Sequence, residues 1–359
     1  MKQNKQTTII INARFLTQPL TGVQRFAIEI SKRLKETYNG QIICLCPKNI
    51  IHKEEAKFLE AKVIGRQEGY LWEQIELPLY LRKTGSPLLI NLTNLAPWFY
   101  KNKIYSLLDT SFVDNKQWFD WKYSLAYNFL IPKLLKSSKA VITISNFSKK
   151  KILQHYDFVN TDKIFVIYCG FNKLATEDVY VSNKENYILS VSSMDPRKNL
   201  AGLIEGFNIY SKTNENISLY IVGGKNRVFS ELDLKINEKI KLLGRVSDNE
   251  LLALYKNAKL FTSLSLYEGF GLPVLEAMSN GIPTLVSDIP VYKELFKGST
   301  FFVDPLAPSS FSNGLEKVLK ETKLNNKLVD EGYKTCEKFN WDNSVRLLVN
   351  VIKNVQKNK

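Results

Sequence analysis

The sequence contains few of the residues from which metal sites and disulfide frameworks are built. It has two histidines and four cysteines among 359 residues, and the cysteines lack metal-ligand spacing. No Asp-x-Asp triplet occurs, so a metal-dependent transferase site has no candidate ligands. We therefore expect a protein that works without a metal cofactor.

Long apolar runs are also missing. No stretch approaches the roughly 20 apolar residues that cross a bilayer as a helix. The first residues, MKQNKQTTIIINARF, contain one short apolar run and do not have the pattern of a signal peptide. These features predict a cytoplasmic protein.

Acidic residues are scarce relative to basic ones, and the imbalance lies mainly in the first half. Residues 1–180 hold 26 Lys and Arg against 15 Asp and Glu (26 − 15 = +11), whereas residues 181–359 hold 24 against 20 (24 − 20 = +4). A basic half favours an anionic partner such as nucleic acid, a diphosphate or an acidic membrane surface, although it also serves solubility. Because no nucleic-acid-binding motif is present, we expect no nucleic acid among the partners.

Short apolar runs of strand length alternate with helical or loop segments along the whole chain. This alternation predicts an α/β fold with mostly parallel, doubly wound sheets. It pauses in the polar stretch 171–186, so we expect two Rossmann-like domains, residues 1–175 and 183–340, joined near residue 180. Residues 341–359 are expected to be helical. The predicted strands are TTIIINA, QIICLCP, SPLLINLTN, KIYSLLD, AVITIS and KIFVIYCG, then YILSVSS, ISLYIVGG, KIKLLG, KLFTSLS, GIPTLVS and STFFVDP.

The segment LSLYEGFGLPVLEAMSNGIP, residues 264–283, places two glutamates in apolar surroundings. Pro273 suits the first turn of a helix that ends at Gly281. The preceding Gly-Phe-Gly is then a loop at a helix N-terminus, which favours an anion such as phosphate. Glu268 in the loop and Glu276 in the helix would accept hydrogen bonds from hydroxyl groups, so a nucleotide sugar fits both features. Alternatively, Glu268 is an exposed loop residue and Glu276 interacts with the helix dipole.

Two further segments place polar groups after predicted strands, where ligands bind in open α/β sheets. Arg197 and Lys198 follow YILSV, and their charges would neutralise a diphosphate. Arg245 and Val246 follow KIKLLG, where a nucleotide base could lie against the backbone. A solvated pair of loop cations and an ordinary strand-to-helix connection remain the simpler alternatives.

These segments together resemble the group 1, or family 4, retaining glycosyltransferases of the GT-B fold. The C-terminal resemblance rests on VSSMDPRKNL, LYIVGG, LLGRVSDNELLALYKNA and SLYEGFGLPVLEAMSNGIPTLVSD. The N-terminal segments INARFLTQPLTGVQRFAIEI, LWEQIELPLYL, NLTNLAP and AVITISNFSKKKIL are similar to the branch that makes bacterial surface polysaccharides. The resemblance covers roughly residues 8 to 340. It implies two facing Rossmann-like domains with an interdomain cleft, and a C-terminal helix that returns to the first domain.

The resemblance also implies roles for individual residues. Glu276 would bind the ribose hydroxyls, and Arg197 with Lys198 the diphosphate. The donor sugar would contact Glu268 and the backbone of Phe270, Gly271 and Leu272, while Gly22 and Val23 from the first domain would close over the phosphates.

The sequence departs from the family pattern at two places. Leu108 stands where the family has a histidine, although the following Asp109 is retained as a candidate catalytic residue. Ser192 and Ser193 replace a glycine and an arginine before the Pro-Arg-Lys element. Arg197 and Lys198 would therefore balance the phosphate charge without that arginine.

The reaction that the resemblance implies is metal-free transfer of a hexose with retention of configuration. The donor would be a GDP-, UDP- or dTDP-linked mannose, rhamnose or similar hexose, and the acceptor a lipid-linked or oligosaccharide intermediate of surface polysaccharide synthesis. Front-face transfer and a double displacement through Glu268 are both open. An epimerase or phosphorylase on the same fold, or a catalytically weak nucleotide-sugar-binding protein, is the alternative function.

Basic and aromatic residues are interleaved in the first half. The segments KLLKSSK (133–139) and SKKKIL (148–153) are strongly basic. Such a composition suits an anionic bilayer surface, so we expect a peripheral protein on the inner face of the cytoplasmic membrane. The aromatic residues could alternatively form core; they are Trp98, Phe99, Tyr100, Trp118, Phe119, Trp121 and Tyr123.

Overall fold

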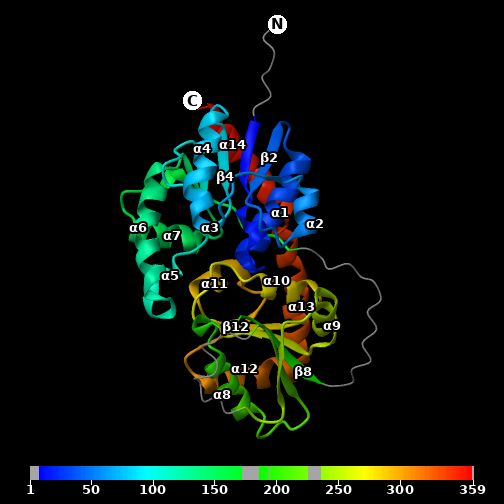
Figure 1. Cartoon of the computed structure of the whole chain (residues 1–359). Coiled ribbons are helices and arrows are strands. Elements are labelled where there is room, and N and C mark those ends of the chain that lie inside the picture. Colours follow the sequence, from blue (N-terminus) through cyan, green and yellow to red (C-terminus); the bar gives the residue numbers. More distant parts are fainter. Residues whose placement is uncertain (1–7, 172–185, 194, 225–235, 358–359) are drawn as a thin grey trace. The chain divides into compact units, whose positions relative to one another are not determined.

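The computed structural model describes residues 8–171, 186–193, 195–224 and 236–357, and the chain divides into two compact units (Figure 1). The first unit is Met1–Gly170 together with Trp341–Lys359, and the second is Phe171–Asn340. The predicted join near residue 180 lies outside the described residues, as does the side chain of Tyr123.

The first unit contains a seven-stranded sheet in the order β3-β2-β1-β4-β5-β6-β7, with every pairing parallel. Its central strands are buried because helices cover both faces, which explains their continuous apolar runs. The six predicted strands are confirmed; the two-residue β3 was not predicted. The strands are β1 Thr8–Asn12, β2 Gln41–Cys46, β3 Lys62–Val63, β4 Leu88–Asn91, β5 Lys103–Ser106, β6 Ala140–Thr143 and β7 Ile164–Val166.

Helices lie on both sides of this sheet, with α1 and α2 opposite α6 and α7 (Figure 1). This arrangement follows from right-handed crossovers that run in opposite directions from the middle of the sheet. The helices are α1 Gly22–Thr37, α2 Lys53–Phe58, α3 Gly69–Leu71, the π-helix η2 Trp72–Glu76, α4 Leu77–Lys83, α5 Ser111–Asp114, α6 Trp121–Ser137, α7 Asn146–His155 and α14 Trp341–Lys357.

The last helix, α14, packs in the first unit although the whole second unit precedes it in sequence. The ring of Trp341 lies 6.1 Å from that of Phe26 in α1. The Ser344 hydroxyl donates to the carbonyl of Tyr168 at 2.6 Å. Apolar residues at helical spacing along α14, including Val345, make it amphipathic, and this face is buried.

The second unit contains a six-stranded parallel sheet in the order β10-β9-β8-β11-β12-β13. Helix α8 packs closely on α12 at Gly206. A Cβ at this position would lie only 2.6 Å from the Phe311 ring, so the absence of a side chain permits the close approach. All six predicted strands are confirmed: β8 Tyr187–Val191, β9 Ser218–Val222, β10 Ile240–Gly244, β11 Leu260–Ser263, β12 Thr284–Ser287 and β13 Phe301–Val303. The helices are α8 Leu200–Tyr210, α9 Asp248–Asn257, α10 Leu272–Ser279, α11 Pro290–Phe296, α12 Pro308–Lys320 and α13 Thr322–Lys338.

The predicted α/β class with two Rossmann-like sheets is confirmed. In both sheets the strand order reverses direction at the middle, between β1 and β4 in the first unit and between β8 and β11 in the second. Ligands of such sheets bind beyond the carboxyl ends of the strands at this reversal. The loops after β8 and β11 are therefore where a site should be sought.

Candidate active site

The loop after β8 presents Arg197 and Lys198 through a short capped turn. The Asp195 carboxylate accepts from the Arg197 N–H at 3.0 Å and so caps the 3₁₀ turn Pro196–Lys198. Asn199 then adopts a left-handed conformation (φ 51°), and its side-chain amide donates to the Pro305 carbonyl at 2.7 Å. The two cations are thereby fixed where β8 ends.

The loop after β11 brings Glu268 to these cations. The Leu266 N–H donates to the Arg197 carbonyl at 2.7 Å, which ties the two loops together. Lys198 Nζ donates to Glu268 Oε1, and Arg197 Nη1 lies 3.6 Å from Oε2. Glu268 is only 7% exposed. It is therefore neither a solvated loop residue nor separate from the cations, and the three side chains form one cluster, here called the Glu268 cluster.

Electrostatics in the Glu268 cluster keep the carboxyl ionised. Burial alone would raise the pKa of Glu268, but Lys198, Arg197 and the Ser265 hydroxyl outweigh it, so the pKa is lowered. Burial lowers the pKa of Lys198, and the Glu268 charge offsets part of that effect. Asp195 Oδ2 also lies 3.4 Å from Arg197 Nε, so two carboxylates balance the two cations. An anionic ligand would therefore be bound through the N–H donors of Arg197 and Lys198 rather than through an excess of positive charge.

Hydroxyl groups that the sequence did not reveal support Glu268. Ser265 Oγ donates to Glu268 Oε1 at 2.8 Å. Ser265 lies 3.3 Å from Ser263 Oγ, which in turn is 2.9 Å from the Tyr292 hydroxyl of α11. The sequence signal for these hydroxyl contacts was the pair of serines, Ser263 and Ser265, shortly before Glu268.

The Gly-Phe-Gly turn enters α10 as predicted. Gly271 has φ 125°, and a Cβ there would lie 2.7 Å from the Tyr292 ring, so glycine is required. The Phe270 side chain is 3% exposed and packs edge-to-face on Phe339 at 5.5 Å. The phenyl ring is thus part of the core, and only the backbone remains for a ligand. Leu272, half-buried, begins the helix, which ends before Gly281 (φ 71°).

Glu276 lies within α10 and is 8% exposed. The Tyr255 hydroxyl of α9 donates to Glu276 Oε2 at 3.0 Å, a contact that the sequence did not indicate. A tyrosine hydroxyl that fixes one carboxylate oxygen orients the group without neutralising it. This geometry is what a carboxylate that accepts from ligand hydroxyls needs.

Gly223, directly after β9, lies against the start of the loop that carries Arg197 and Lys198. Its φ is 156°, and a Cβ would lie 1.7 Å from the Ser192 carbonyl oxygen. Gly223 therefore allows the end of β9 to approach the start of the 192–198 loop, which explains the first glycine of the pair in LYIVGG.

Replacing Gly223 with alanine is expected to displace this loop and lower the melting temperature by several degrees. The backbone clash must be relieved by movement of Ser192, a strain of about 1–3 kcal/mol. Thermal unfolding of Gly223→Ala against Gly224→Ala checks this, because a Cβ at Gly224 meets only the Arg245 side chain. Equal melting temperatures for both variants would contradict the role of Gly223.

Arg245 and Val246 follow β10, the edge strand of the second sheet. Two strands, β9 and β8, separate them from β11. Arg245 is exposed and Val246 half-buried. They lie at the carboxyl end of the sheet, as predicted, but no contact among the described residues joins them to Glu268 or Lys198.

The remaining predicted residues belong to the first unit. Asp109 Oδ1 accepts from the N–H and the hydroxyl of Ser111 at 3.0 and 2.7 Å, so its side chain is held at the turn before α5. Leu108, at the histidine position of the family, is 3% exposed and packs in the core. Gly22 begins α1 and is exposed, and Val23 is half-buried.

A buried polar network at the carboxyl ends of β1 and β4 was not predicted. Asn12 Nδ2 donates to Glu73 Oε1 at 2.7 Å and to Asn91 Oδ1 at 2.6 Å. Arg14 Nε lies 3.2 Å from Glu73 Oε1, and its guanidinium stacks on the Tyr70 ring at 4.9 Å. Glu73 is fully buried on the π-helix η2, and burial raises its pKa. The network joins β1, the 3₁₀ turn Arg14–Thr17, η2 and β4 at the reversal of the first sheet.

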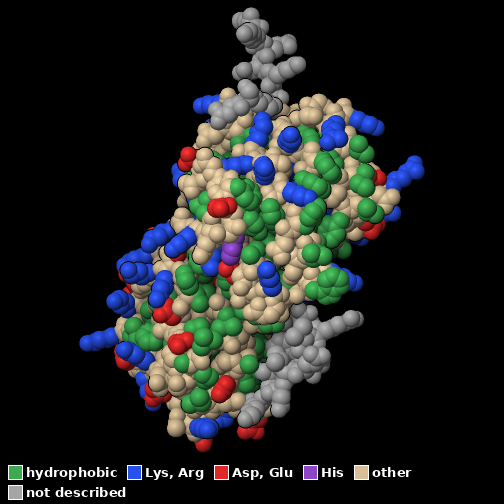
Figure 2. Space-filling view, turned by 90° about the vertical axis from the view of Figure 1, so that its left-hand side faces the viewer, with side chains coloured by type: hydrophobic (Ala, Val, Ile, Leu, Met, Phe, Trp, Pro, Cys, Tyr) green, Lys and Arg blue, Asp and Glu red, His purple; other side chains and the backbone are tan. Residues whose placement is uncertain are grey.

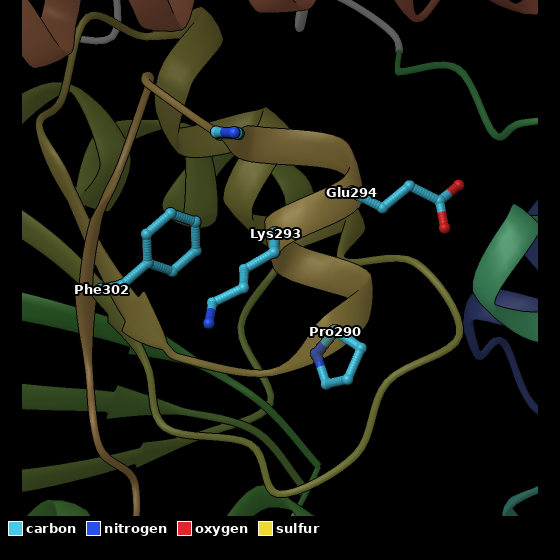
Figure 3. A pocket seen from close by; sticks show the side chains of 5 residues that line it. Pro290, Lys293, Glu294 and Phe302 are labelled. Carbon is cyan, nitrogen blue, oxygen red and sulfur yellow. The ribbon is translucent and has the colours of Figure 1, made fainter.

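A shallow pocket on the second unit is separate from the Glu268 cluster. It lies between α11 and β13, and Figure 3 shows Lys293 and Phe302 on one side of α11 with Glu294 extending to the other. Its lining includes none of the residues predicted for the site. Lys293 is paired with Asp288 at 2.6 Å.

The described part of the chain lacks two kinds of feature. Within it, no three His, Cys, Asp or Glu side chains are grouped so that they could hold a metal ion. No helix there combines the length and apolarity needed to traverse a bilayer.

Two doubly wound parallel sheets in two successive units are the architecture of the GT-B class of folds. The sequence model of the family described as "Glycosyl transferases group 1" matches residues 175–335. The second unit is thus similar in sequence to the glycosyltransferases of this group.

Two relatives are similar in sequence over a larger part of the chain, and a solved structure shares its fold. The chain is 28% identical over 330 residues to "O-antigen chain mannosyltransferase RfbU" of Salmonella typhimurium, covering 86% of this chain and 90% of the relative. It is 26% identical over 240 residues to "O-antigen chain mannosyltransferase B" of Escherichia coli, covering 61% of each. The crystal structure of Anabaena HepE in complex with UDP and glucose superposes with a TM-score of 0.74 at 15% identity, covering 97% of this chain and 99% of that one.

Proposed function

We propose that the protein transfers a mannosyl or closely related hexosyl group from a nucleoside diphosphate sugar to a lipid-linked or saccharide acceptor, with retention of configuration. The observation that carries the proposal is the Glu268 cluster at the strand reversal of the second sheet. The mannose assignment is supported by the two relatives, which are both named as mannosyltransferases. A nucleotide-sugar donor is supported by the UDP and glucose bound to HepE.

The donor's charged and polyol parts match the charged groups of the second unit. Arg197 and Lys198 would bind the diphosphate, whose oxygens would compete with Glu268 and Asp195 for their N–H donors. Glu276, oriented by Tyr255, would accept from the ribose hydroxyls. Glu268 and the backbone of residues 270–272 would contact the hexose, and Arg245 with Val246 would border the base. Gly22 and Val23, at the N-terminus of α1, would contribute from the first unit.

Transfer would then proceed on one face of the sugar. The bond from the anomeric carbon to the phosphate oxygen breaks, and a bond to the acceptor oxygen forms on the same face. The departing phosphate takes the acceptor proton, while Arg197 and Lys198 stabilise the negative charge that develops on the diphosphate. Glu268 is a poor candidate for a covalent nucleophile, because Lys198 and Ser265 both donate to it. Asp109, which accepts from Ser111 at the start of α5, would act by holding the loop beyond β5.

Product analysis tests the proposal. The protein is incubated with GDP-, UDP- and dTDP-linked hexoses, with and without a bacterial lipid extract, and donor and product are followed by NMR. We expect one donor to be consumed, mainly when acceptor is present, with the anomeric configuration retained. Conversion of the donor to an isomer without acceptor would instead identify an epimerase, and an intact donor under all conditions a binding protein.

A further inference from the structure

Helix α6 exposes a line of large apolar side chains to solvent. Trp121, Leu125 and Phe129 are four residues apart and are 68%, 64% and 55% exposed. Residues at this spacing form one face of a helix. The opposite face of α6 is buried in the core of the unit through other residues, among them Ile131 and Leu134. The exposed line is therefore not needed for folding of the unit.

The segment 98–99 extends this apolar surface beyond α6. The Trp98 ring stacks on Phe99 at 4.4 Å and meets Phe129 edge-on at 5.7 Å. Phe99 is itself 63% exposed. We call Trp98, Phe99, Trp121, Leu125 and Phe129 the α6 surface.

A second helical segment borders the α6 surface. Gln74 of η2 bonds to the Ala96 carbonyl and the Trp98 N–H at 2.9 Å each, which fixes the segment 96–98 against this helix. The helical segment continues without a break from α3 through η2 to α4. Along it, Leu71, Ile75 and Leu79 are again four residues apart and at least half exposed. Exposed apolar side chains thus continue from α3–α4 across residues 98–99 to α6.

The charged groups over the rings of the α6 surface are cationic, and the exposed Asp120 lies just before the helix. Lys133 Nζ lies 3.0 Å from the Phe129 ring centroid and 4.0 Å from that of Trp98, and Lys122 Nζ lies 5.5 Å from that of Trp121. The helix contains three lysines and no acidic residue. Figure 2 faces the side on which α6 lies in Figure 1, and it shows adjoining hydrophobic groups bordered by Lys and Arg side chains.

We propose that the α6 surface is the docking site for an anionic lipid bilayer. Aromatic rings settle at the headgroup level, and flanking lysines attract anionic headgroups. A large exposed apolar patch marks an interaction surface, and the absence of acidic residues on α6 favours anionic lipid over a second copy of this basic chain. The inference deepens the proposed function, because docking would bring the enzyme to a lipid-linked acceptor.

Vesicle sedimentation without donor or acceptor tests docking independently of turnover. The wild-type protein should sediment with phosphatidylglycerol-containing vesicles at low salt, leave them at moderate salt through screening, and stay in solution with phosphatidylcholine alone. The variant Trp121→Ser/Leu125→Ser/Phe129→Ser should bind at least about tenfold more weakly, since three buried apolar contacts are lost. Wild-type protein that stays in the supernatant with anionic vesicles at low salt would overturn the proposal.

A matched control is Ile51→Ser/Ile209→Ser/Leu306→Ser, which removes three exposed apolar side chains elsewhere and should sediment as the wild type does. Should the α6 variant fail to fold, Lys122→Glu/Lys133→Glu keeps the apolar residues and should abolish binding to anionic vesicles. Equal sedimentation of the α6 variants and the wild type would contradict the assignment. The assignment would also be contradicted if the wild-type protein were a dimer in gel filtration, the α6 variant were a monomer, and anionic vesicles did not dissociate the wild-type dimer.

Discussion

Replacing Lys198 with methionine should lower donor turnover by about 100-fold or more and lower the stability of the fold. The turnover loss follows because Lys198 would stabilise the charge on the leaving diphosphate. The stability loss, about 3 kcal/mol, follows because the substitution leaves the buried Glu268 without its nearest cation. Initial rates with the preferred donor and thermal unfolding measure the two effects.

A double substitution tests the stability effect by itself, because Glu268 would also contact the hexose and its loss would lower turnover. In Lys198→Met/Glu268→Gln the neutral amide keeps the Ser265 hydrogen bond and needs no cation, so stability should largely return while turnover stays low. Lys334→Met is the matched control, because Lys334 also bonds to a glutamate, Glu331 at 2.7 Å, but on an exposed helix face. Turnover restored in the double variant would show that Lys198 is only a structural partner of Glu268.

Replacing Glu276 with alanine should weaken binding of the nucleoside diphosphate by about 1–3 kcal/mol, the cost of lost hydrogen bonds to a charged group. The reason is that this carboxylate would accept from the ribose hydroxyls. Tyr255→Phe keeps the carboxylate but removes the hydroxyl that orients it, so a smaller loss of about 1 kcal/mol is expected. Calorimetric titration with the nucleoside diphosphate measures both.

The control for this pair is Glu331→Ala, which removes an exposed carboxylate of the same unit and should leave the affinity unchanged. Glu268→Ala should differ from Glu276→Ala, because it would cut turnover while the nucleoside diphosphate still binds. An equal loss of nucleotide affinity in both glutamate variants would contradict the division between hexose and ribose contacts.

The fold could be predicted from the sequence because nearly all strands are buried in parallel sheets, and burial makes them continuous apolar runs. The exception is β3, whose Lys62 and Val63 are both exposed, so no apolar pattern marks it. The π-helix at Trp72–Glu76 also left no sequence signal, because its residues follow ordinary helical composition.

The site could be predicted only in part. Arg197, Lys198 and Glu268 were recognised, but as two separate contacts with a ligand. Their assembly into one cluster depends on β8 lying next to β11, and strand order cannot be read from local patterns. Tyr255 was missed for a similar reason: its hydroxyl reaches Glu276 only because α9 and α10 lie against the same sheet.

For Phe270 the sequence predicted the backbone turn but not the direction of the side chain. The sequence put it in a glycine-rich turn at a ligand, yet its ring packs on Phe339. A turn of this kind fixes the backbone, while the direction of its side chain depends on residues distant in sequence. Aromatic residues of the first half were likewise ambiguous: Tyr100 is buried, whereas Phe99 is exposed.

Hydrogen–deuterium exchange with and without nucleoside diphosphate tests the location of the donor site most directly. The ligands would be GDP, UDP and dTDP, each in excess over its dissociation constant. With the nucleotide that binds, slower exchange is expected in residues 195–199, 264–271 and the first turns of α10, since bound phosphate and ribose would hold these loops closed. Protection confined to the pocket of Pro290, Lys293 and Phe302, with no change around Lys198 and Glu268, would contradict the account.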